Sequence, residues 1–503
     1  MTSKHHIFSL VLLAVLPLIA WAQENSAPQY QVGQQTVGNS QQAPDSSQPS
    51  TDNTQQQNVP APAFGQDAPA PQVVENPPLS GLDQPALEPD LAARSFLIVG
   101  AHATEGMDTN AAGRFGGGFP ISSLTRLLGS AALQRLWKRY ALDFDYIGGG
   151  GLYANYTRGN AQIHALNVDQ RIRWRTGQLA IRDSFSDLPE GAFGYGSFGG
   201  AGGYDLGGFG AIGGSLDGGG ASYFSSSQFG SAGQIPRITN TALGEVQEAF
   251  SPRSSATLIG SYGFTDFIGN DTKNFINSHQ IGFQAGYNYQ LNRRDQISLV
   301  YGYQNFQYPV STDGSFTTDM WHVLYGHRIS GRMQLVLGGG PQLTNINSFS
   351  LAGQPVNYTN FTVTGRASLK YKFPKTSIDL SFNRLNTNGS GLLTGATSNI
   401  TKFDISRPIR RHWTAVADLG YAHNTRIIQL AGTQANSYQF GYAAAAMRRA
   451  FGRYWDVYGS YQFNELSFNA PFCGTAENGC GRVSQRQVVT IGIDWHPRPI
   501  RLD

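Results

Sequence analysis

The sequence predicts an all-β fold, a transmembrane antiparallel up-and-down β-barrel of about 18 strands. Segments in which apolar and polar residues alternate run from about Phe96 to Trp495, and short basic turns between them alternate with longer loops rich in Gly, Asn, Ser and Thr. Beyond the first residues, no stretch of about 18 apolar residues could cross a membrane as a helix. Because a backbone in lipid must satisfy its own N–H and C=O groups, a closed sheet is the remaining way to span.

The chain begins with the features of a signal peptide. Lys4 precedes an apolar run from Ile7 to Ile19, and the small-residue site Ala20-Trp21-Ala22 follows. This arrangement predicts a signal peptide over residues 1–22, with cleavage before Gln23. No twin arginine precedes the apolar run, so we expect export by the general secretory route.

Residues 23–93 have the composition of a disordered periplasmic leader. They are rich in Gln, Pro, Ala, Ser and Asn, with Tyr30 and Phe64 as the only aromatic residues. Such a segment cannot bury enough apolar surface to fold. Its charged residues are all acids: Glu24, Asp45, Asp52, Asp67, Glu75, Asp83, Glu88 and Asp90. One hypothesis is therefore that the leader docks on the basic turns of the barrel and partly gates its mouth.

The segment Gln280–Leu291 shows the strand pattern most clearly, because apolar side chains alternate in it with Gly, Gln or Asn. Phe361–Phe373, Ile378–Asn383 and Val489–Trp495 repeat the alternation. A soluble β-sandwich or propeller would show the same pattern, with the apolar face in a protein core. The regular succession of short turns and long loops favours a barrel, whose apolar face contacts lipid.

The connections set the strand count. Short turns are expected near 135–138, 176–177, 251–253, 292–295, 330–331, 374–375, 408–411 and 450–453. Longer loops are expected near 105–121, 148–161, 187–239, 268–276, 309–316, 346–359, 387–398, 424–436 and 469–484. With a first strand near Phe96–Ala103 and a last strand ending at Trp495, residues 94–503 form a barrel of 18 strands.

Ser122–Leu136 is the ambiguous part of this count, because it also fits an amphipathic helix, which would leave 16 strands. We favour the strand. Ala131–Tyr140 resembles Ala445–Tyr454, and both segments precede an alternating strand, as if one hairpin unit were reused.

The loop 187–239 is the longest and is rich in glycine over Gly194–Gly220. It contains a G-x-G-x-x-G pattern at Gly208–Gly213, which is a weak signal for a dinucleotide site because no buried strand precedes it and no helix follows. The loop is either a flexible surface loop or a constriction that folds into the lumen and presents aromatic rings to sugars or other ligands.

Charged residues on the polar side of the strands are the candidate pore lining. Mixed rings of such charges can set ion selectivity, although inward strands of a barrel are polar in any case. Arg171, Arg173 and Arg175 are the best candidates for an anion-attracting wall, because alternate residues of a strand point the same way. The candidate lining residues are Asp143, Asp145, Asp169, Arg171, Arg173, Arg182, Arg366, Asp379, Lys402, Asp404, Asp418, Asp456 and Asp494.

The remaining reactive residue types indicate no catalysis. Cys473 and Cys480 are the only cysteines, and in an exported protein they suit a local disulfide better than a metal site. The ten histidines follow no recognisable Ser, His and acid pattern, so we expect neither an enzyme nor a bound metal or cofactor. Export also argues against nucleic acid as a partner.

The signal peptide, the even strand count, the alternating loop lengths and the Tyr/Phe-rich strand ends together resemble the outer-membrane β-barrel proteins of Gram-negative bacteria. Tyr140–Gly151, YALDFDYIGGGG, and Tyr325–Gly340, YGHRISGRMQLVLGGG, look most like uncharacterised porin-like proteins sometimes encoded with exopolysaccharide systems. Such barrels usually end on an aromatic residue that the barrel-assembly machinery reads, whereas this chain continues past Trp495 to Asp503. Assembly would then depend on an internal signal near Gly492–Trp495.

The resemblance implies a protein of the outer membrane, in contact with its lipid, through which small hydrophilic solutes diffuse passively. Two alternatives stay open. One is a component of exopolysaccharide export, and the other is a structural or adhesive barrel with a closed lumen.

Overall fold

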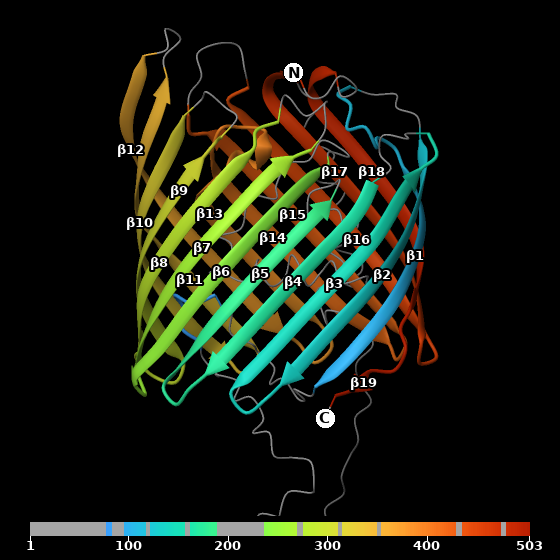
Figure 1. Ribbon diagram of the computed structural model, residues 1–503, viewed down its shortest axis with the longest axis horizontal. Helices are drawn as coiled ribbons and strands as arrows, with labels where there is room; N and C mark the ends of the chain where they lie inside the picture. Colours follow the sequence, from blue (N-terminus) through green and yellow to red (C-terminus); the bar gives the residue numbers. More distant parts are fainter. Residues whose placement is uncertain are drawn as a thin grey trace, which may run out of the picture. The chain divides into compact units, whose positions relative to one another are not determined.

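The computed structural model describes residues 77–82, 95–116, 121–155, 161–188, 236–268, 275–309, 314–349, 354–428, 435–473 and 479–502. Their strands pair into one antiparallel sheet (Figure 1). The strands are β1 Phe96–Asp108, β2 Ser122–Leu136, β3 Tyr140–Tyr153, β4 Ala161–Arg173, β5 Gly177–Leu188, β6 Arg237–Ser251, β7 Ser254–Phe267, β8 Ser278–Gln290, β9 Asp295–Gln307, β10 Ser315–Ser330, β11 Met333–Phe349, β12 Pro355–Lys372, β13 Ser377–Thr387, β14 Ala396–Arg410, β15 Trp413–Arg426, β16 Ser437–Phe451, β17 Trp455–Cys473, β18 Cys480–Trp495 and β19 Ile500–Arg501. Across this described part, no helix is long and apolar enough to span a membrane.

The sheet closes on itself. Each strand from β1 to β18 pairs with its neighbours in the sequence, and β18 returns to pair with β1 from Ala101 opposite Trp495 to Asp108 opposite Val488. Ser122–Leu136 is a strand paired on both sides, to β1 and to β3, so the helical interpretation of this segment is wrong. The barrel therefore has the 18 strands that the sequence predicts, and β19 is a short addition.

The two faces of the wall differ in chemistry, as β8 illustrates. Its apolar residues Ile281 and Tyr287 are about half exposed, at 50% and 46%, whereas Gln284 and Asn288 on the other face are 4% and 1% exposed. Residues that pair across strands share a face, so this division continues around the ring. In a sandwich the apolar face would be covered by a second sheet, but here it forms the outside of the barrel.

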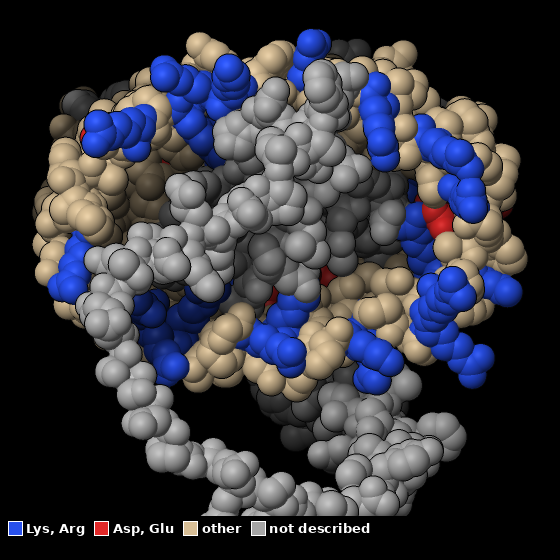
Figure 2. Space-filling model, turned by 90° about the horizontal axis from the view of Figure 1, so that it is seen from below, with Lys and Arg blue, Asp and Glu red and all other residues tan. Residues whose placement is uncertain are grey.

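One end of the barrel carries a ring of basic residues, seen from below in Figure 2. Each of the hairpin turns at this end contributes at least one Lys or Arg. β1 begins and β18 ends at the same end of the barrel. The ring is formed by Lys138, Arg139, Arg175, Arg253, Arg293, Arg294, Arg332, Lys375, Arg411 and Arg453. The strand ends that the longer connections join lie at the opposite end, so short and long connections alternate along the described strands as expected.

The C-terminal residues extend the seam where the barrel closes. After β18 ends at Trp495, β19 turns back to pair Ile500 with Leu97 and Arg501 with Phe96. Leu502 N–H donates to Ser95 O over 3.2 Å, and His496 N–H donates to Tyr454 O over 2.9 Å. The last long strand ends at Trp495 as the alternation predicts, whereas the pairing of the residues that follow was not expected.

One long connection enters the lumen. β12 pairs with β13 only as far as Gly365 opposite Arg384, although β12 continues to Pro355 beside β11. After Arg384, β13 remains paired with β14 alone. The chain then turns into the barrel, and every residue of 385–396 is buried. Gly389, Gly391 and Gly395 have positive φ angles, which glycine adopts without strain and which let this short segment fold tightly.

Candidate functional site

The candidate site is the lumen of the barrel. Because the strand pattern directs every second side chain inward, the wall collects polar groups that are withdrawn from solvent. Those that are at least nine-tenths buried include His102, Thr104, Arg126, Asn167, Arg182, Glu245, Thr257, Gln280, Gln284, Asn288, Gln304, His322, Gln342, Arg366, Asp418, Asp456, Gln462 and Asp494. Two segments from elsewhere in the chain occupy the space that they enclose.

The first occupant is the inward loop 388–395 between β13 and β14. Leu392 and Leu393 belong to an apolar cluster inside the barrel that also holds Leu243, Met320 and Phe468 from β6, β10 and β17. Side-chain hydrogen bonds fix the beginning of the loop. Asn388 Nδ2 donates to Ser278 Oγ over 2.8 Å, and nearby Asn386 Nδ2 donates to Thr344 Oγ1 over 2.8 Å. The sequence placed a loop here but did not indicate that it folds inward.

The second occupant is Pro77–Leu82, which the sequence analysis counted within a wholly disordered leader. These six residues instead lie buried inside the barrel. Arg366 Nη2 donates to Leu79 O over 2.7 Å, and Leu82 N–H donates to Glu245 Oε1 over 3.2 Å. The expectation of disorder is therefore wrong for this stretch, because it overlooked that a lumen can supply partners to a segment that cannot fold alone. The rest of residues 23–93, and the hypothesis of docking on the rim, lie outside the described residues.

Two of the arginines predicted for the lining, Arg171 and Arg182, meet at one carboxylate. Arg171 and Arg173 lie on the same face of β4 as Asp169, and Arg182 of β5 lies directly opposite Asp169. Arg171 Nη2 lies 2.8 Å from Asp169 Oδ2, and Arg182 Nε lies 3.1 Å from the same oxygen. Asp169 thus balances one of the positive charges of this wall. Arg175 does not join the group, because it lies in the exposed turn after β4.

Acidic residues form a row on the wall across the ring from these arginines. The strand register places Asp379 of β13 opposite Asp404 of β14, and Asp404 opposite Asp418 of β15. Lys370 Nζ lies 3.5 Å from Asp379 Oδ2, and Tyr442 O–H donates to Asp418 Oδ1 over 2.8 Å. Lys402 lies on the same face of β14, nearer the middle of the barrel. The row was not foreseen as a unit, because the pairing of three strands brings it together.

The last two predicted acids lie at the closing seam. His102 Nδ1 is 2.8 Å from Asp494 Oδ1, while His102 Nε2 is 2.8 Å from Ser130 Oγ. Asp456 on β17 is bonded to Arg448 and accepts from His496 Nε2 over 2.7 Å. A cavity of about 290 Å³ adjoins these groups, with Asp145, Arg453 and Pro497 also in its lining.

The row Ser130, His102 and Asp494 has the order of a hydrolase triad, which the sequence alone did not reveal. Catalysis of acyl transfer also needs N–H donors for the developing oxyanion. Ser130 sits in the middle of β2, where its backbone and that of its neighbours pair with β1 and β3. Those N–H groups are already used by the sheet, so the arrangement suits a hydrogen-bonded brace of the seam better than an active site.

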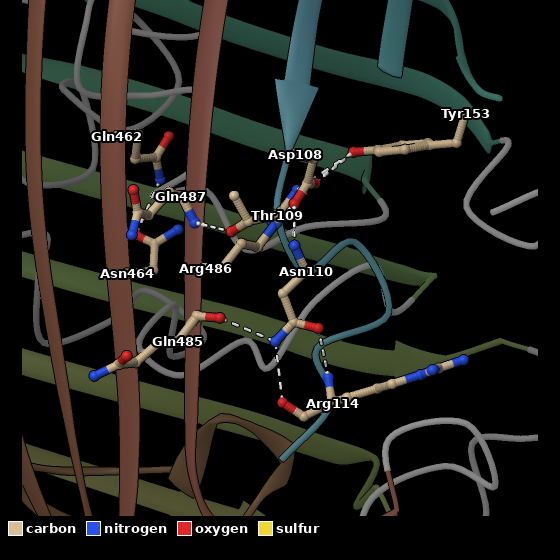
Figure 3. Close-up of polar contacts among 10 residues, drawn as sticks. All are labelled: Asp108, Thr109, Asn110, Arg114, Tyr153, Gln462, Asn464, Gln485, Arg486 and Gln487. Atoms are coloured by element: carbon tan, nitrogen blue, oxygen red, sulfur yellow. Dashed lines mark hydrogen bonds and ion pairs between the residues drawn. The ribbon is translucent and has the colours of Figure 1, made fainter. Parts of the chain in front are cut away.

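At the end with the long loops, a buried ion pair braces the same seam (Figure 3). Arg486 Nε of β18 donates to both carboxylate oxygens of Asp108, over 3.0 Å and 2.9 Å. Tyr153 O–H donates to Asp108 Oδ2 over 3.3 Å, and Asn110 N–H donates to Asp108 Oδ1 over 2.9 Å. These residues escaped the sequence analysis, because only the closure of β1 on β18 makes them neighbours.

The two cysteines lie at this end as well. Cys473 ends β17 and Cys480 begins β18, and the two are joined by a disulfide with their Cα atoms 4.1 Å apart. Among the described residues, no group of three or more His, Cys, Asp or Glu side chains could hold a metal ion. The glycine-rich part of loop 187–239, with its possible role as a constriction, lies outside the described residues.

No protein-family model matches the sequence, and no curated protein matches it either. Solved structures with a similar arrangement include three from Pseudomonas aeruginosa. OccK2 (OpdF) in complex with glucuronate is 12% identical, with a TM-score of 0.39, over 81% of this chain and 98% of that chain. OpdK with vanillate is 11% identical, with a TM-score of 0.38, over 80% and 98%. OccK5 (OpdH) is 9% identical, with a TM-score of 0.37, over 81% and 98%. At these values the likeness carries no inference about function.

Proposed function

We propose that this protein is an outer-membrane channel of a Gram-negative bacterium, through which small hydrophilic solutes diffuse passively. The observation that carries the proposal is the division of the wall, with apolar side chains on the outside and buried polar and charged side chains on the inside. Lipid can solvate the first face, and water or a polar solute can contact the second. The signal peptide expected over residues 1–22 supports the location, and the barrel-assembly machinery is the partner proposed for insertion.

The charges of the lumen support a path for charged as well as neutral solutes. The wall of β4 and β5 presents Arg171, Arg173 and Arg182, and the wall of β13–β15 presents the row of Asp379, Asp404 and Asp418. Side chains of both signs on facing walls can hydrogen-bond a polar solute and orient its dipole as it passes. The solute class we propose is therefore small and polar, with no catalytic step.

Planar-bilayer recording on the purified and refolded protein tests this function. We expect discrete conductance steps that are absent when the same preparation is heat-denatured. Absence of steps from the wild type and from variants that lack the two lumen segments would contradict a channel. Recovery of the mature protein as a water-soluble, detergent-free monomer would contradict the location in a membrane.

A barrel with a closed lumen, serving a structural or adhesive role, is the second candidate. It is favoured by one observation, the burial of both Pro77–Leu82 and the loop 388–395 inside the ring. The two functions differ in what the lumen segments do when they are removed. A channel then conducts more, whereas a structural barrel is destabilised without any gain in conductance.

A further inference from the structure

We propose that the lumen contains a specific binding site for a short peptide, and that Pro77–Leu82 of the chain's own leader fills it as a removable plug. The ligand class is a short peptide folded into a turn, with an apolar residue, Ser, Gly and a second apolar residue in succession, as in Leu79-Ser80-Gly81-Leu82. Gly81 N–H donates to Pro78 O over 3.0 Å and closes this turn. The site needs no assumption about transport, but the role of the peptide as a plug rests on the proposed channel function.

The wall recognises the backbone of the peptide through side chains from several strands. Asn288 Oδ1 accepts from Ser80 N–H over 3.1 Å, and Gln284 Nε2 donates to Ser80 O over 2.7 Å. Glu245 and Arg366 bind the groups on either side, at Leu82 N–H and Leu79 O. These four side chains come from β6, β8 and β12, so the peptide is bound by several strands of the barrel and not by one strand.

The side chains of the peptide are recognised too. Ser80 Oγ lies 2.5 Å from Thr257 Oγ1 and accepts from Asn288 Nδ2 over 2.6 Å. Leu79 packs with Val300 and Leu324 in one apolar cluster, while Leu82 packs in the larger cluster that includes Leu392 and Leu393. Ser80 of the peptide thus contacts polar side chains of the wall, and Leu79 and Leu82 on either side of it contact apolar ones.

Glycine residues in the wall leave room for the peptide. A Cβ atom placed on Gly286 would lie 2.2 Å from Ser80 Cβ, and one on Gly326 would lie 2.9 Å from Leu79 Cδ2. A Cβ atom on Gly81 of the peptide would lie 2.7 Å from Glu245 Oε1. Since carbon atoms do not approach so closely without a shift, both partners are small where they touch. This close fit indicates a specific binding site and not a loose association of the segment with a wide pore.

The peptide is suited to leave and return. Its contacts are hydrogen bonds to side chains and two apolar anchors, and it forms no strand pairing with the wall. Residues 83–94 connect it covalently to β1, so its concentration near the site stays high after it leaves. Leu82 shares an apolar cluster with Leu392 and Leu393, so the peptide and the inward loop 388–395 belong to one buried group inside the barrel.

A disulfide trap tests the site without any reference to conductance. Ser80→Cys and Thr257→Cys replace two oxygens that lie 2.5 Å apart, so the two sulfurs should reach bonding distance with little movement. In the full mature chain we expect an oxidised cross-link between these positions, found by mass spectrometry of the unreduced digest. Ser80→Cys with Ser460→Cys, on β17 across the ring, is the matched control and should cross-link far less.

A third substitution tests the fit of the peptide. Adding Gly286→Leu to the Ser80→Cys and Thr257→Cys pair should strongly reduce the cross-link, because the new side chain takes the place of Ser80. Gly260→Leu on β7 is the control, since a Cβ atom there meets nothing within 4 Å. Equal cross-linking in both triple variants, or in the pair and its Ser460→Cys control, would overturn the proposed site. Heat-modifiable migration in gels shows that each variant has folded.

Conductance then tests the role as a plug. Deletion of residues 77–82 should at least double the unit conductance or the open fraction, and reduction of the Ser80→Cys–Thr257→Cys cross-link should raise conductance reversibly. If the wild type, the deletion variant and the cross-linked pair all show the same conductance, the peptide is not a plug. If the cross-link forms but no variant conducts, the channel function is refuted while the peptide site stands.

Discussion

Asp108 and Arg486 join the first strand to the last, and they do so almost without contact with solvent. Their side chains are 0% and 7% exposed, and the carboxylate also accepts from Tyr153 and from the backbone of Asn110. A buried ion pair adds little net stability compared with apolar residues, but the loss of one partner leaves the other charge desolvated and unpaired. The pair therefore matters most for holding the seam in register.

Asp108→Asn should destabilise the folded barrel by about 3–5 kcal/mol, because it strands the buried guanidinium of Arg486. The free energy of unfolding in urea, followed by loss of heat-modifiable migration in detergent or lipid, measures this cost. Asp379→Asn is the matched control. Asp379 pairs with Lys370 across 3.5 Å and is 37% exposed, so its loss should cost less than about 1 kcal/mol. Equal costs for the two variants would contradict the assigned burial of the seam pair.

The inward loop 388–395 depends on its apolar residues. Leu393 is 0% exposed and packs in the cluster inside the barrel, so Leu393→Ala should cost about 2–5 kcal/mol of stability. Replacing 389–395 by a short Gly-Ser linker should raise the single-channel conductance, because the loop fills part of the lumen. Conductance equal to that of the wild type would show that the loop does not obstruct the path. The same linker length placed at 410–412, in a basic turn, is the control and should leave conductance unchanged.

We expect assembly to depend on the end of β18, where Trp495 is the aromatic residue of the last long strand. Trp495 pairs with Ala101 and with Trp455, at the point where the ring closes. Trp495→Ser should therefore lower the yield of heat-modifiable barrel in the outer membrane. A chain truncated after Trp495, which lacks β19 but keeps the aromatic end, should assemble better than the substituted chain. Normal yields of the Trp495→Ser protein would argue against this internal signal.

Across the whole barrel, the charges of the lumen are divided between facing walls. Asp404 lies between two other acids, so Asp404→Asn relieves repulsion within the row while it removes negative charge from the path. The reversal potential in a salt gradient should then shift toward anion selectivity. Asp319→Asn is the control, because Asp319 lies on the outer face beside Tyr301. An unchanged reversal potential in the Asp404→Asn channel would exclude this row from the ion path.

The barrel itself could be predicted because its information is local. Alternation in segments such as Gln280–Leu291 sets which side chains share a face, and turn residues such as Arg293-Arg294 set where strands end. The polar lining expected from the same period includes Arg171, Arg182, Asp418 and Asp494, of which Arg182, Asp418 and Asp494 are buried. What the period cannot give is the partner of each charge, because Asp169 between Arg171 and Arg182 depends on strand register.

The sequence by itself indicated the strands and their order, and favoured 18 strands over 16, because these follow from a two-residue period and from turn chemistry. Only the tertiary structure decided what fills the ring. Pro77–Leu82 and the loop 388–395 are too short to signal burial. Asn288, Glu245 and Arg366, which bind Pro77–Leu82, and Ser278, which binds Asn388, are far from these segments along the chain. A closed sheet brings such distant groups to one enclosed space, and that space supplies the hydrogen bonds and apolar contacts that neither segment could form alone.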